Sequence, residues 1–114
     1  MSDQQLKLLH KMKLLISQGH KKFANRHDCN YLQDLADICI TENEAWEQIL
    51  SINKSFYWRD GKQSYYKNDN NALEFKKVIN SKLIYIKLKI EEYDNSEMTV
   101  CLSFHIDHRK VIKL

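Results

Sequence analysis

Proline is absent from this 114-residue sequence, and glycine (two residues) and cysteine (three residues) are scarce. With so little glycine, the chain has no Gly-rich phosphate-binding loop, which excludes the nucleotide-dependent enzyme classes. The three cysteines, Cys29, Cys39 and Cys101, are odd in number and form no Cys-x-x-Cys pair. We therefore expect reduced thiols in a cytoplasmic protein, rather than a disulfide framework or a zinc site.

Long apolar runs are also absent. The longest run spans only a few residues, and Lys7, Lys11 and Lys13 interrupt the apolar positions near the N-terminus. Neither a signal peptide nor a membrane span can be placed, so we expect no membrane partner. With 43% apolar and 29% charged residues, the composition predicts one compact soluble domain over residues 1–114, large enough to bury a single core.

Charge is unevenly distributed along the chain, although the formal net charge is only +3. Residues 1–27 carry six basic side chains and one acidic, whereas residues 28–50 carry six acidic side chains and no basic one. Residues 51–90 are basic again, with nine basic and three acidic side chains. Basic blocks attract polyanions, but they are equally typical of solvated surfaces. The acidic block also permits a third interpretation, in which the protein is mainly an assembly surface.

Two helices are predicted near the N-terminus. Apolar residues recur with a 3.6-residue period over residues 3–17, and Gly19 follows as a stop signal. A polar connection over residues 20–30 precedes a shorter stretch with helical periodicity over residues 31–38. The N-terminal basic helix is therefore expected to be separate from the second helix.

A third helix is predicted to begin at Thr41. Thr41 and Glu44 have the spacing of a capping box, and apolar residues continue with helical periodicity to Leu50. Aromatic residues then predict a short strand over residues 55–58, followed by a turn at Asp60-Gly61.

The second half of the chain has the pattern of strands. A polar loop over residues 62–71 precedes a strand over residues 73–76. Apolar and polar residues then alternate over residues 83–90 and 98–106, and the turn-like residues 93–96 join these two strands into a hairpin. Helices followed by strands predict an α+β fold, with the N-terminal helices packed on one face of an antiparallel β-sheet.

Alternation assigns each side chain of the hairpin to one face. The side chains expected to face the helices are Ile84, Ile86, Leu88, Ile90, Met98, Val100, Leu102, Phe104 and Ile106. Those expected to face outward are Leu83, Tyr85, Lys87, Lys89, Thr99, Cys101, Ser103 and His105. The outward set is too polar to form a core.

Two registers of the hairpin remain open. Pairing Ile90 with Met98 places Tyr85 opposite Ser103, whereas a shift of two residues places Tyr85 opposite His105. In either register a phenol, an imidazole and ammonium groups lie within about 5–8 Å of one another.

These residue types can together cleave RNA without a metal. Cleavage through the 2′-hydroxyl needs a base to take its proton, an acid to protonate the leaving 5′-oxygen, and fixed positive charge beside the phosphorane oxygens. His, Glu, Tyr, Lys and Arg supply all three. Aromatic rings and Arg also stack on unpaired bases, so Trp58, Arg59, Tyr65 and Tyr66 are candidates for holding single-stranded RNA.

Each of these features also has an ordinary structural explanation. Outward lysines such as Lys87 and Lys89 often only solubilise a strand. Tyr85 can simply cover the sheet, and a histidine near a strand end, such as His105, is commonly a surface residue.

Two other chemistries fit the sequence poorly. His105 and His108 have a metal-ligand spacing, but no third ligand is evident, so we expect no metal and no cofactor. Cys101 and His105 both point outward in this pattern, but four residues span about 13 Å along a strand, which is too far for direct activation of a thiol.

The order of several short blocks resembles the MqsR family of toxins from bacterial toxin-antitoxin systems, which are small mRNA interferases with a RelE-like fold. The resemblance covers roughly residues 20–107, and a Tyr-x-Lys-Leu strand followed by a Ser-Phe-His strand end is its specific part. The blocks that carry it are Ile38-Cys39-Ile40-Thr41 leading into the Glu-rich helix, Phe56-Tyr57, Leu73-Glu74-Phe75, Leu83-Ile84-Tyr85-Ile86-Lys87-Leu88 and Cys101-Leu102-Ser103-Phe104-His105.

The resemblance implies particular catalytic residues. The sheet tyrosine of the family corresponds to Tyr85, and the basic residue that ends its last strand corresponds to His105. Its basic residue after Phe-Tyr falls near Trp58 or Arg59, and charge favours Arg59. Its polar residue in the next strand corresponds to Glu74, which could act as a general base.

The sequence departs from the family pattern in two places. Cys39 replaces the glycine of a Leu-Gly-Ile/Leu turn, and the basic helix within residues 1–19 lies outside the resemblance. The family also implies an antitoxin with a zinc-binding part and a DNA-binding part.

Together these observations predict a cytoplasmic, RelE-like endoribonuclease toxin that cleaves mRNA and is held inactive by a cognate antitoxin. Whether a ribosome must present the mRNA is left open. The alternative is a non-catalytic module that binds RNA or protein with the same basic face. The predicted catalytic residues are His105, Tyr85, Glu74 and Arg59, and the predicted RNA-binding residues are Lys87, Lys89, Trp58, Tyr65 and Tyr66.

Overall fold

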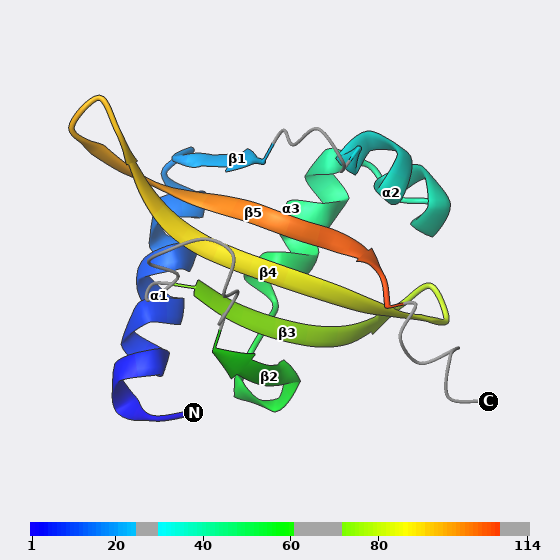
Figure 1. The fold of residues 1–114 in the computed structure, drawn as a ribbon, viewed down its shortest axis with the longest axis horizontal. Coiled ribbons are helices and arrows are strands. Elements are labelled where there is room, and N and C mark those ends of the chain that lie inside the picture. The colour runs from blue at the N-terminus through cyan, green and yellow to red at the C-terminus, as the bar shows by residue number, and fades with distance from the viewer. Residues whose placement is uncertain (25–29, 61–71, 108–114) are drawn as a thin grey trace.

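The computed structural model describes residues 1–24, 30–60 and 72–107, and at residues 59 and 60 it describes the backbone only. Helices and strands in these ranges form an α+β protein (Figure 1). Their bounds are α1 Asp3–Ser17, β1 Lys21–Phe23, α2 Tyr31–Ile38, α3 Glu42–Leu50, the 3-10 helix η1 Lys54–Phe56, β2 Tyr57–Asp60, β3 Ala72–Ile79, β4 Lys82–Tyr93 and β5 Ser96–Ile106.

Each α-helix begins at a side chain that caps its first turn. Ser2 and Gln5 form a capping box at α1, in which the Ser2 hydroxyl accepts from the Gln5 backbone N–H at 3.2 Å. Thr41 and Glu44 form the capping box of α3, and Asn30 caps α2. Caps of this kind stabilise a helix by about 1 kcal/mol. The three predicted helices are confirmed. None of the described helices is long and apolar enough to cross a membrane.

The turn after α2 contains a residue with a left-handed backbone conformation. Cys39 follows the helix with φ of 67°, in the left-handed region where glycine is favoured. A residue with a Cβ pays about 1–2 kcal/mol for this conformation. Cysteine therefore occupies a position whose geometry suits glycine.

The strands form one sheet in the order β1-β5-β4-β3-β2. Neighbouring strands are antiparallel except for β1, which is parallel to β5. The prediction of an antiparallel sheet is therefore wrong at this edge, and residues 20–30 are not only a connection. β1 is too short to show a pattern; Phe23 anchors it by stacking on Tyr31 and by packing against Trp46, each at 4.7 Å between ring centroids.

The described residues include two β-hairpins, β3–β4 and β4–β5, that close with tight two-residue turns. Asn80 and Ser81 between β3 and β4 have positive φ, and so do Asp94 and Asn95 between β4 and β5. Such turns match the right-handed twist of the flanking strands, and Asn and Asp tolerate positive φ best after glycine. The predicted hairpin turn over residues 93–96 is confirmed.

The region before the hairpins differs from the prediction. Residues 55–58 are not one strand, because η1 precedes β2, which extends from Tyr57 into Asp60. Asn53 caps the 3-10 turn by accepting from the Ser55 backbone N–H at 2.9 Å. Gly61 and the predicted loop over residues 62–71 lie outside the described residues, and β3 is longer than the predicted strand.

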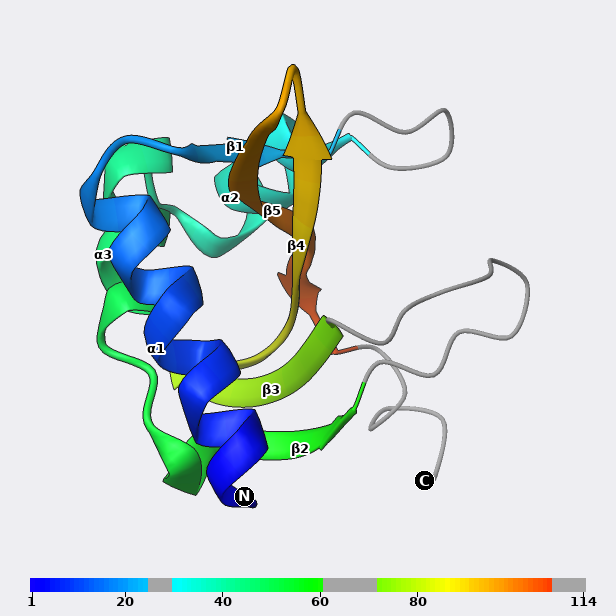
Figure 2. The same cartoon turned by 90° about the vertical axis from the view of Figure 1, so that its left-hand side faces the viewer.

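Two helices cover one face of the sheet. α1 and α3 pack on this face, which we call the inner face, while α2 lies beside β5 near the sheet edge (Figure 2). The opposite side of the sheet is the outer face. The largest side chains with almost no exposed surface in the core between helices and sheet are Leu9, Met12, Ile38, Ile49, Ile52, Leu73, Phe75, Ile84, Ile86, Leu88 and Phe104.

A β-bulge lies in the middle of the long hairpin. Lys87 pairs with Ser103, but the next residue of β4, Leu88, pairs with Cys101. Leu102 is therefore an extra residue in β5. A bulge of this kind shifts the alternation of side chains between the two faces by one position.

The faces predicted for the first part of β5 are reversed by this bulge. Cys101 lies in the core, and the Thr99 hydroxyl donates to the Met12 carbonyl of α1 at 2.9 Å, so both side chains face the helices. Met98 and Val100, which were predicted to face the helices, occupy outer-face positions. Beyond the bulge the predicted faces are correct.

Candidate functional site

The outer face carries two rows of polar residues across β3, β4 and β5. Register partners in neighbouring strands lie side by side, with Cβ atoms about 4.5–5.5 Å apart. Each row takes one residue from each strand: Lys76, Tyr85 and His105 in the first row, and Glu74, Lys87 and Ser103 in the second.

Tyr85 and His105 form the centre of the candidate site. They are direct register partners, and their ring centroids lie 5.3 Å apart with an angle of 47° between the planes. At the turn end of the hairpin, Ile90 pairs with Thr99 rather than with Met98. This pairing is shifted by one residue from the first register considered above, and the bulge at Leu102 adds a second residue. Tyr85 therefore lies opposite His105, as in the second register.

The imidazole of His105 has a defined tautomer. Its Nδ1 lies 2.9 Å from the Ile106 carbonyl oxygen. A carbonyl oxygen only accepts, so Nδ1 carries the proton and the lone pair of the neutral ring is on Nε2. The Ile106 carbonyl therefore orients the ring with Nε2 as the atom able to take a proton.

Trp58 extends the aromatic surface toward β2. Its ring lies edge-on to Tyr85, with 5.9 Å between centroids and 85° between planes. The ammonium group of Lys76 lies 3.9 Å from the centre of the Trp58 ring, within the range of a cation–π interaction. The predicted RNA-binding Trp58 thus lies beside the predicted catalytic Tyr85.

Lys76 is also held by an ion pair. Its Nζ lies 3.0 Å from Oδ2 of Asp107, whose side chain is only 2% exposed, whereas the Lys76 side chain is 29% exposed. A buried carboxylate of this kind fixes the position of its cationic partner. Lys76 therefore sits between Asp107 and Trp58, with part of its side chain at the surface.

Glu74 and Lys87 are neighbours in the second row, and both are buried, with 0% and 4% of their surface exposed. Opposite charges on facing strands compensate part of the cost of removing each from water. On the other side of Glu74, the backbone of Arg59 is its register partner in β2. These three predicted site residues therefore lie next to one another in the sheet.

Other predicted residues lie apart or cannot be placed. Lys89 is on the same face as Tyr85, but the two residues are four positions apart in β4, a separation of about 13 Å. The Nζ of Lys89 lies 4.0 Å from the Glu91 carboxylate. The side chain of Arg59 and the whole of Tyr65 and Tyr66 lie outside the described residues, as does His108.

The sequence interpretation missed Lys76 and Asp107. Both follow from strand alternation, because Lys76 lies two residues after Glu74 and Asp107 lies two residues after His105. Lys76 ended the predicted strand over residues 73–76 but was not assigned to a face, and Asp107 lay one residue beyond the predicted strand over residues 98–106.

The possibility of a Cys101–His105 pair is removed by the bulge. Cys101 is 2% exposed and lies in the core, whereas His105 is on the outer face. The Cys101 thiol also donates to the Ser103 carbonyl at 3.3 Å. Over the described ranges, no three His, Cys, Asp or Glu side chains gather closely enough to hold a metal ion.

The fold and the site define the protein as an α+β protein with a mixed sheet, whose outer face groups a histidine, a tyrosine, a tryptophan and paired charges. The chain matches no family model, no curated protein and no solved structure. The function must therefore be argued from the site itself.

Proposed function

We propose that this protein is an endoribonuclease that cleaves single-stranded mRNA through the 2′-hydroxyl, without a metal, and that a cognate antitoxin neutralises it. The observation that carries this proposal is the pairing of Tyr85 with His105 on the outer face, beside the ammonium group of Lys76. These groups supply a proton acceptor, a proton donor and positive charge within one row of the sheet.

The reaction forms a bond between the 2′-oxygen and phosphorus and breaks the bond between phosphorus and the 5′-oxygen. His105 takes the proton of the 2′-hydroxyl on Nε2, because Nδ1 already donates to the Ile106 carbonyl. Tyr85 orients the phosphate and donates its hydroxyl proton to the leaving 5′-oxygen, and the protonated His105 then returns a proton to the tyrosinate, so that both groups regain their starting states. The products are a 2′,3′-cyclic phosphate and a free 5′-hydroxyl.

The charged residues stabilise the crowded phosphorane. Lys76 is the better placed cation, because it lies in the row of Tyr85 and His105 and 29% of its side chain is exposed. Lys87 adds positive charge from the second row. Glu74, with no exposed surface, is better placed to balance Lys87 than to act as the general base. Arg59 remains a candidate for phosphate binding.

The resemblance to the MqsR family supports the same activity and suggests the antitoxin. The blocks around Tyr85 and His105 carry that resemblance, and they are the residues paired across β4 and β5. Trp58, edge-on to Tyr85, supplies an aromatic surface on which an unpaired base can stack.

The direct test is to incubate the purified protein with a 20-nucleotide single-stranded RNA in the presence of EDTA. We expect scission with cyclic-phosphate ends. His105→Ala is expected to slow cleavage by about 10²–10⁴-fold, the usual contribution of a general acid or base. Tyr85→Phe is expected to slow it less, because the ring is retained, and both variants should relieve growth arrest when expressed.

His10→Ala is the matched control, because His10 is an exposed histidine on α1. It should cleave as the unmodified protein does, and thermal melting should show that all three variants are folded. Full cleavage and full toxicity in the doubly substituted His105→Ala, Tyr85→Phe protein would contradict the proposal. Retardation of the RNA without scission would instead indicate a non-catalytic binding module.

A further inference from the structure

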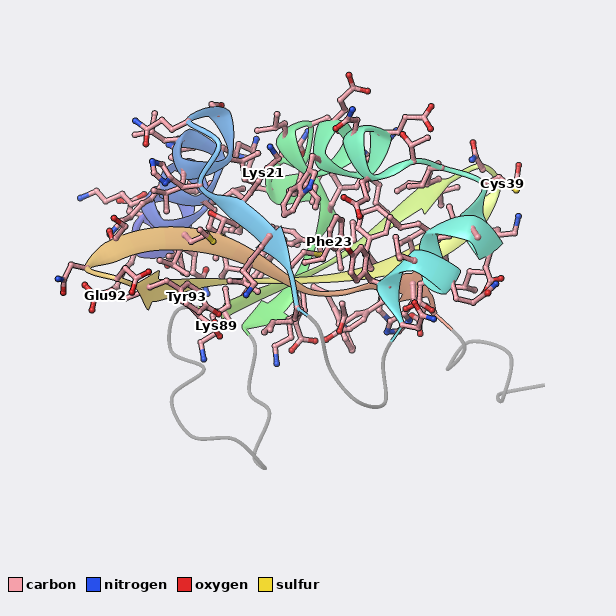
Figure 3. All side chains as sticks on the ribbon, turned by 90° about the horizontal axis from the view of Figure 1, so that it is seen from above. Lys21, Phe23, Cys39, Lys89, Glu92 and Tyr93 are labelled. Atoms are coloured by element: carbon pink, nitrogen blue, oxygen red, sulfur yellow. The ribbon has the colours of Figure 1, made fainter. Side chains whose placement is uncertain are left out.

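The outer face continues beyond the candidate site onto a projecting ribbon. Among the described residues, β3 pairs with β4 only as far as Lys89, and the last four residues of β4 pair with β5 (Figure 1). Lys89 and Tyr93 lie on the side of the sheet away from α1 and α3 (Figure 3). The ribbon thus extends the face that carries Tyr85 and His105.

A lysine of β1 joins this extension. Lys22 pairs with Val100 of β5, which in turn pairs with Lys89 of β4, so Lys22 belongs to the outer face. Its Nζ lies 4.6 Å from the centre of the Tyr93 ring. Both side chains are exposed, and Tyr93 retains 39% of its surface. An exposed aromatic ring and a cation are therefore held together at the far end of the face.

Tyr93 has a fixed orientation and a fixed charge state. Its hydroxyl donates to the Glu91 carboxylate, and this hydrogen bond, with partial burial and the negative charge of Glu91, raises the pKa of Tyr93 above 10. The ring is therefore neutral at physiological pH and is held on the outer face between Glu91 and Lys22.

The distance to the candidate site suits an extended strand of nucleic acid. Tyr93 and Tyr85 are eight residues apart in β4, which corresponds to about 26 Å, and Lys87 and Lys89 lie between them at intervals of about 7 Å. Single-stranded RNA is bound by proteins through basic side chains that follow its backbone and aromatic rings that stack on its bases. Lys87 is only 4% exposed, whereas 19% of the Lys89 side chain is exposed, so Lys89 is the lysine between the two tyrosines that can contact RNA directly.

We propose that Lys22 and Tyr93 form a second subsite for single-stranded RNA, several nucleotides away from the scissile phosphate. Tyr93 stacks on a base, and Lys22 contacts a neighbouring phosphate. The subsite rests on the proposed function, since it binds the same RNA that the Tyr85–His105 pair cleaves, and it makes the affinity depend on RNA length.

The charges of the ribbon favour RNA on this side. Glu92 and Glu97 are register partners on the inner side, where Glu97 forms an ion pair with Lys11 at 2.8 Å. On the outer side, the Glu91 carboxylate lies 4.0 Å from the Lys89 ammonium group and accepts from the hydroxyl of Tyr93, the ring that Lys22 contacts. Removing the charge of Glu91 should therefore strengthen RNA binding, whereas removing that of Glu92 should change it little.

The experiment measures binding of two RNAs in which every 2′-hydroxyl is methylated, so that neither is cleaved: one of three nucleotides and one of fifteen. The unmodified protein should bind the longer RNA more tightly. Tyr93→Ala should weaken binding of the longer RNA by about five- to 150-fold, the range expected for loss of one stacked base, and should leave the short RNA unaffected. Tyr93→Phe should retain the affinity.

Charge variants test the phosphate contact. Lys22→Ala should reduce the slope of log affinity against log salt concentration by about 0.7, the value for one phosphate of a single strand. Lys7→Ala, at an exposed position of α1, is the matched control and should leave the slope unchanged. Glu91→Gln should tighten binding of the longer RNA, and Glu92→Gln should not.

The outcomes separate this inference from the proposed function. Equal affinity for the two RNAs, or no effect of Tyr93→Ala on the longer one, would overturn the second subsite even if the protein cleaves RNA. Length-dependent binding that requires Tyr93, in a protein that does not cleave unmethylated RNA, would support the subsite while the nuclease proposal fails. Binding of neither RNA would overturn both.

Discussion

The two faces of the sheet are built from the same strands but are stabilised in different ways. On the inner face Phe75, Ile86 and Phe104 are fully buried against α1 and α3. On the outer face Glu74 and Lys87 are buried to a similar degree, yet they are charged. Burial alone therefore does not mark the core of this protein.

The difference lies in how the buried groups are satisfied. Apolar side chains on the inner face gain free energy in proportion to the area removed from water. Buried charges pay a desolvation cost that is offset only where an opposite charge or a hydrogen bond is close, as in the Lys76–Asp107 pair. The inner face should thus dominate stability, and changes on the outer face should affect chemistry more than folding.

The largest expected effect on stability comes from the inner face. Phe104→Ala should lower the free energy of unfolding by about 3–5 kcal/mol, because it leaves a cavity among fully packed side chains. Val78→Ala, on an exposed outer-face position, is the matched control and should change stability by less than about 0.5 kcal/mol. Chemical denaturation measures both, and equal losses would contradict the proposed division between the faces.

A smaller effect is expected from the charge pair of the outer face. Lys76→Met leaves the buried Asp107 carboxylate without this ion pair and should cost about 1–3 kcal/mol. The double variant Lys76→Met, Asp107→Leu should recover most of that stability, because it removes the buried carboxylate together with its cationic partner.

The same double variant separates folding from chemistry. Its RNA cleavage should stay as low as that of Lys76→Met, because the ammonium group beside Tyr85 is missing in both. Recovery of cleavage together with stability would show that Lys76 acts only through the fold.

The smallest expected effect on stability comes from the ammonium group of Lys77, on the inner face. Lys77 Nζ donates to the Gln48 carbonyl at 3.3 Å and to the Ser51 hydroxyl. Burial lowers the pKa of Lys77, and the positive charge of Lys13 lowers it further; burial also lowers the pKa of Lys13. The folded protein therefore holds these protons less tightly than the unfolded chain, so stability rises as pH increases from the lowered pKa values toward 10.5.

Lys13→Met should remove part of this pH dependence. We expect a higher melting temperature at pH 7, corresponding to less than about 1 kcal/mol, and a flatter rise between pH 7 and 9.5. That range stays below the ionisation of Tyr31, whose pKa is raised above 10 mainly by its hydrogen bond to Glu42. Lys7→Met, at an exposed position, should alter the pH dependence of stability less. A steeper rise of stability with pH in the Lys13→Met variant would show that the lowered pKa values of Lys13 and Lys77 do not cause the rise.

Local signals in the sequence predicted the helices well. The capping box of Thr41 and Glu44 forms as expected, and α1 covers the predicted residues 3–17. These signals involve residues three or four positions apart, which contact one another in the helix itself. β1 carries no such signal, because Phe23 depends on Tyr31 and Trp46, which are brought to it by folding.

The site was predictable only in part. Alternation correctly placed Tyr85 and His105 on one face, but it left their register open and assigned Thr99 and Cys101 to the wrong face. An extra residue such as Leu102 changes the alternation without leaving a pattern, because Val100 and Cys101 both fit a buried position. The bulge is recognisable only from the strand pairing.

The helix starts, the tight turn between the long strands and the residue types suited to acid–base chemistry could all be predicted from the amino-acid sequence. These features depend on hydrogen bonds and side-chain types within a few residues. The pairing of Tyr85 with His105, the addition of Lys76 and Asp107 to the site and the contact of Lys22 with Tyr93 arise from folding. Such contacts join residues far apart in the chain, so they follow from how the strands pair and where the bulge lies.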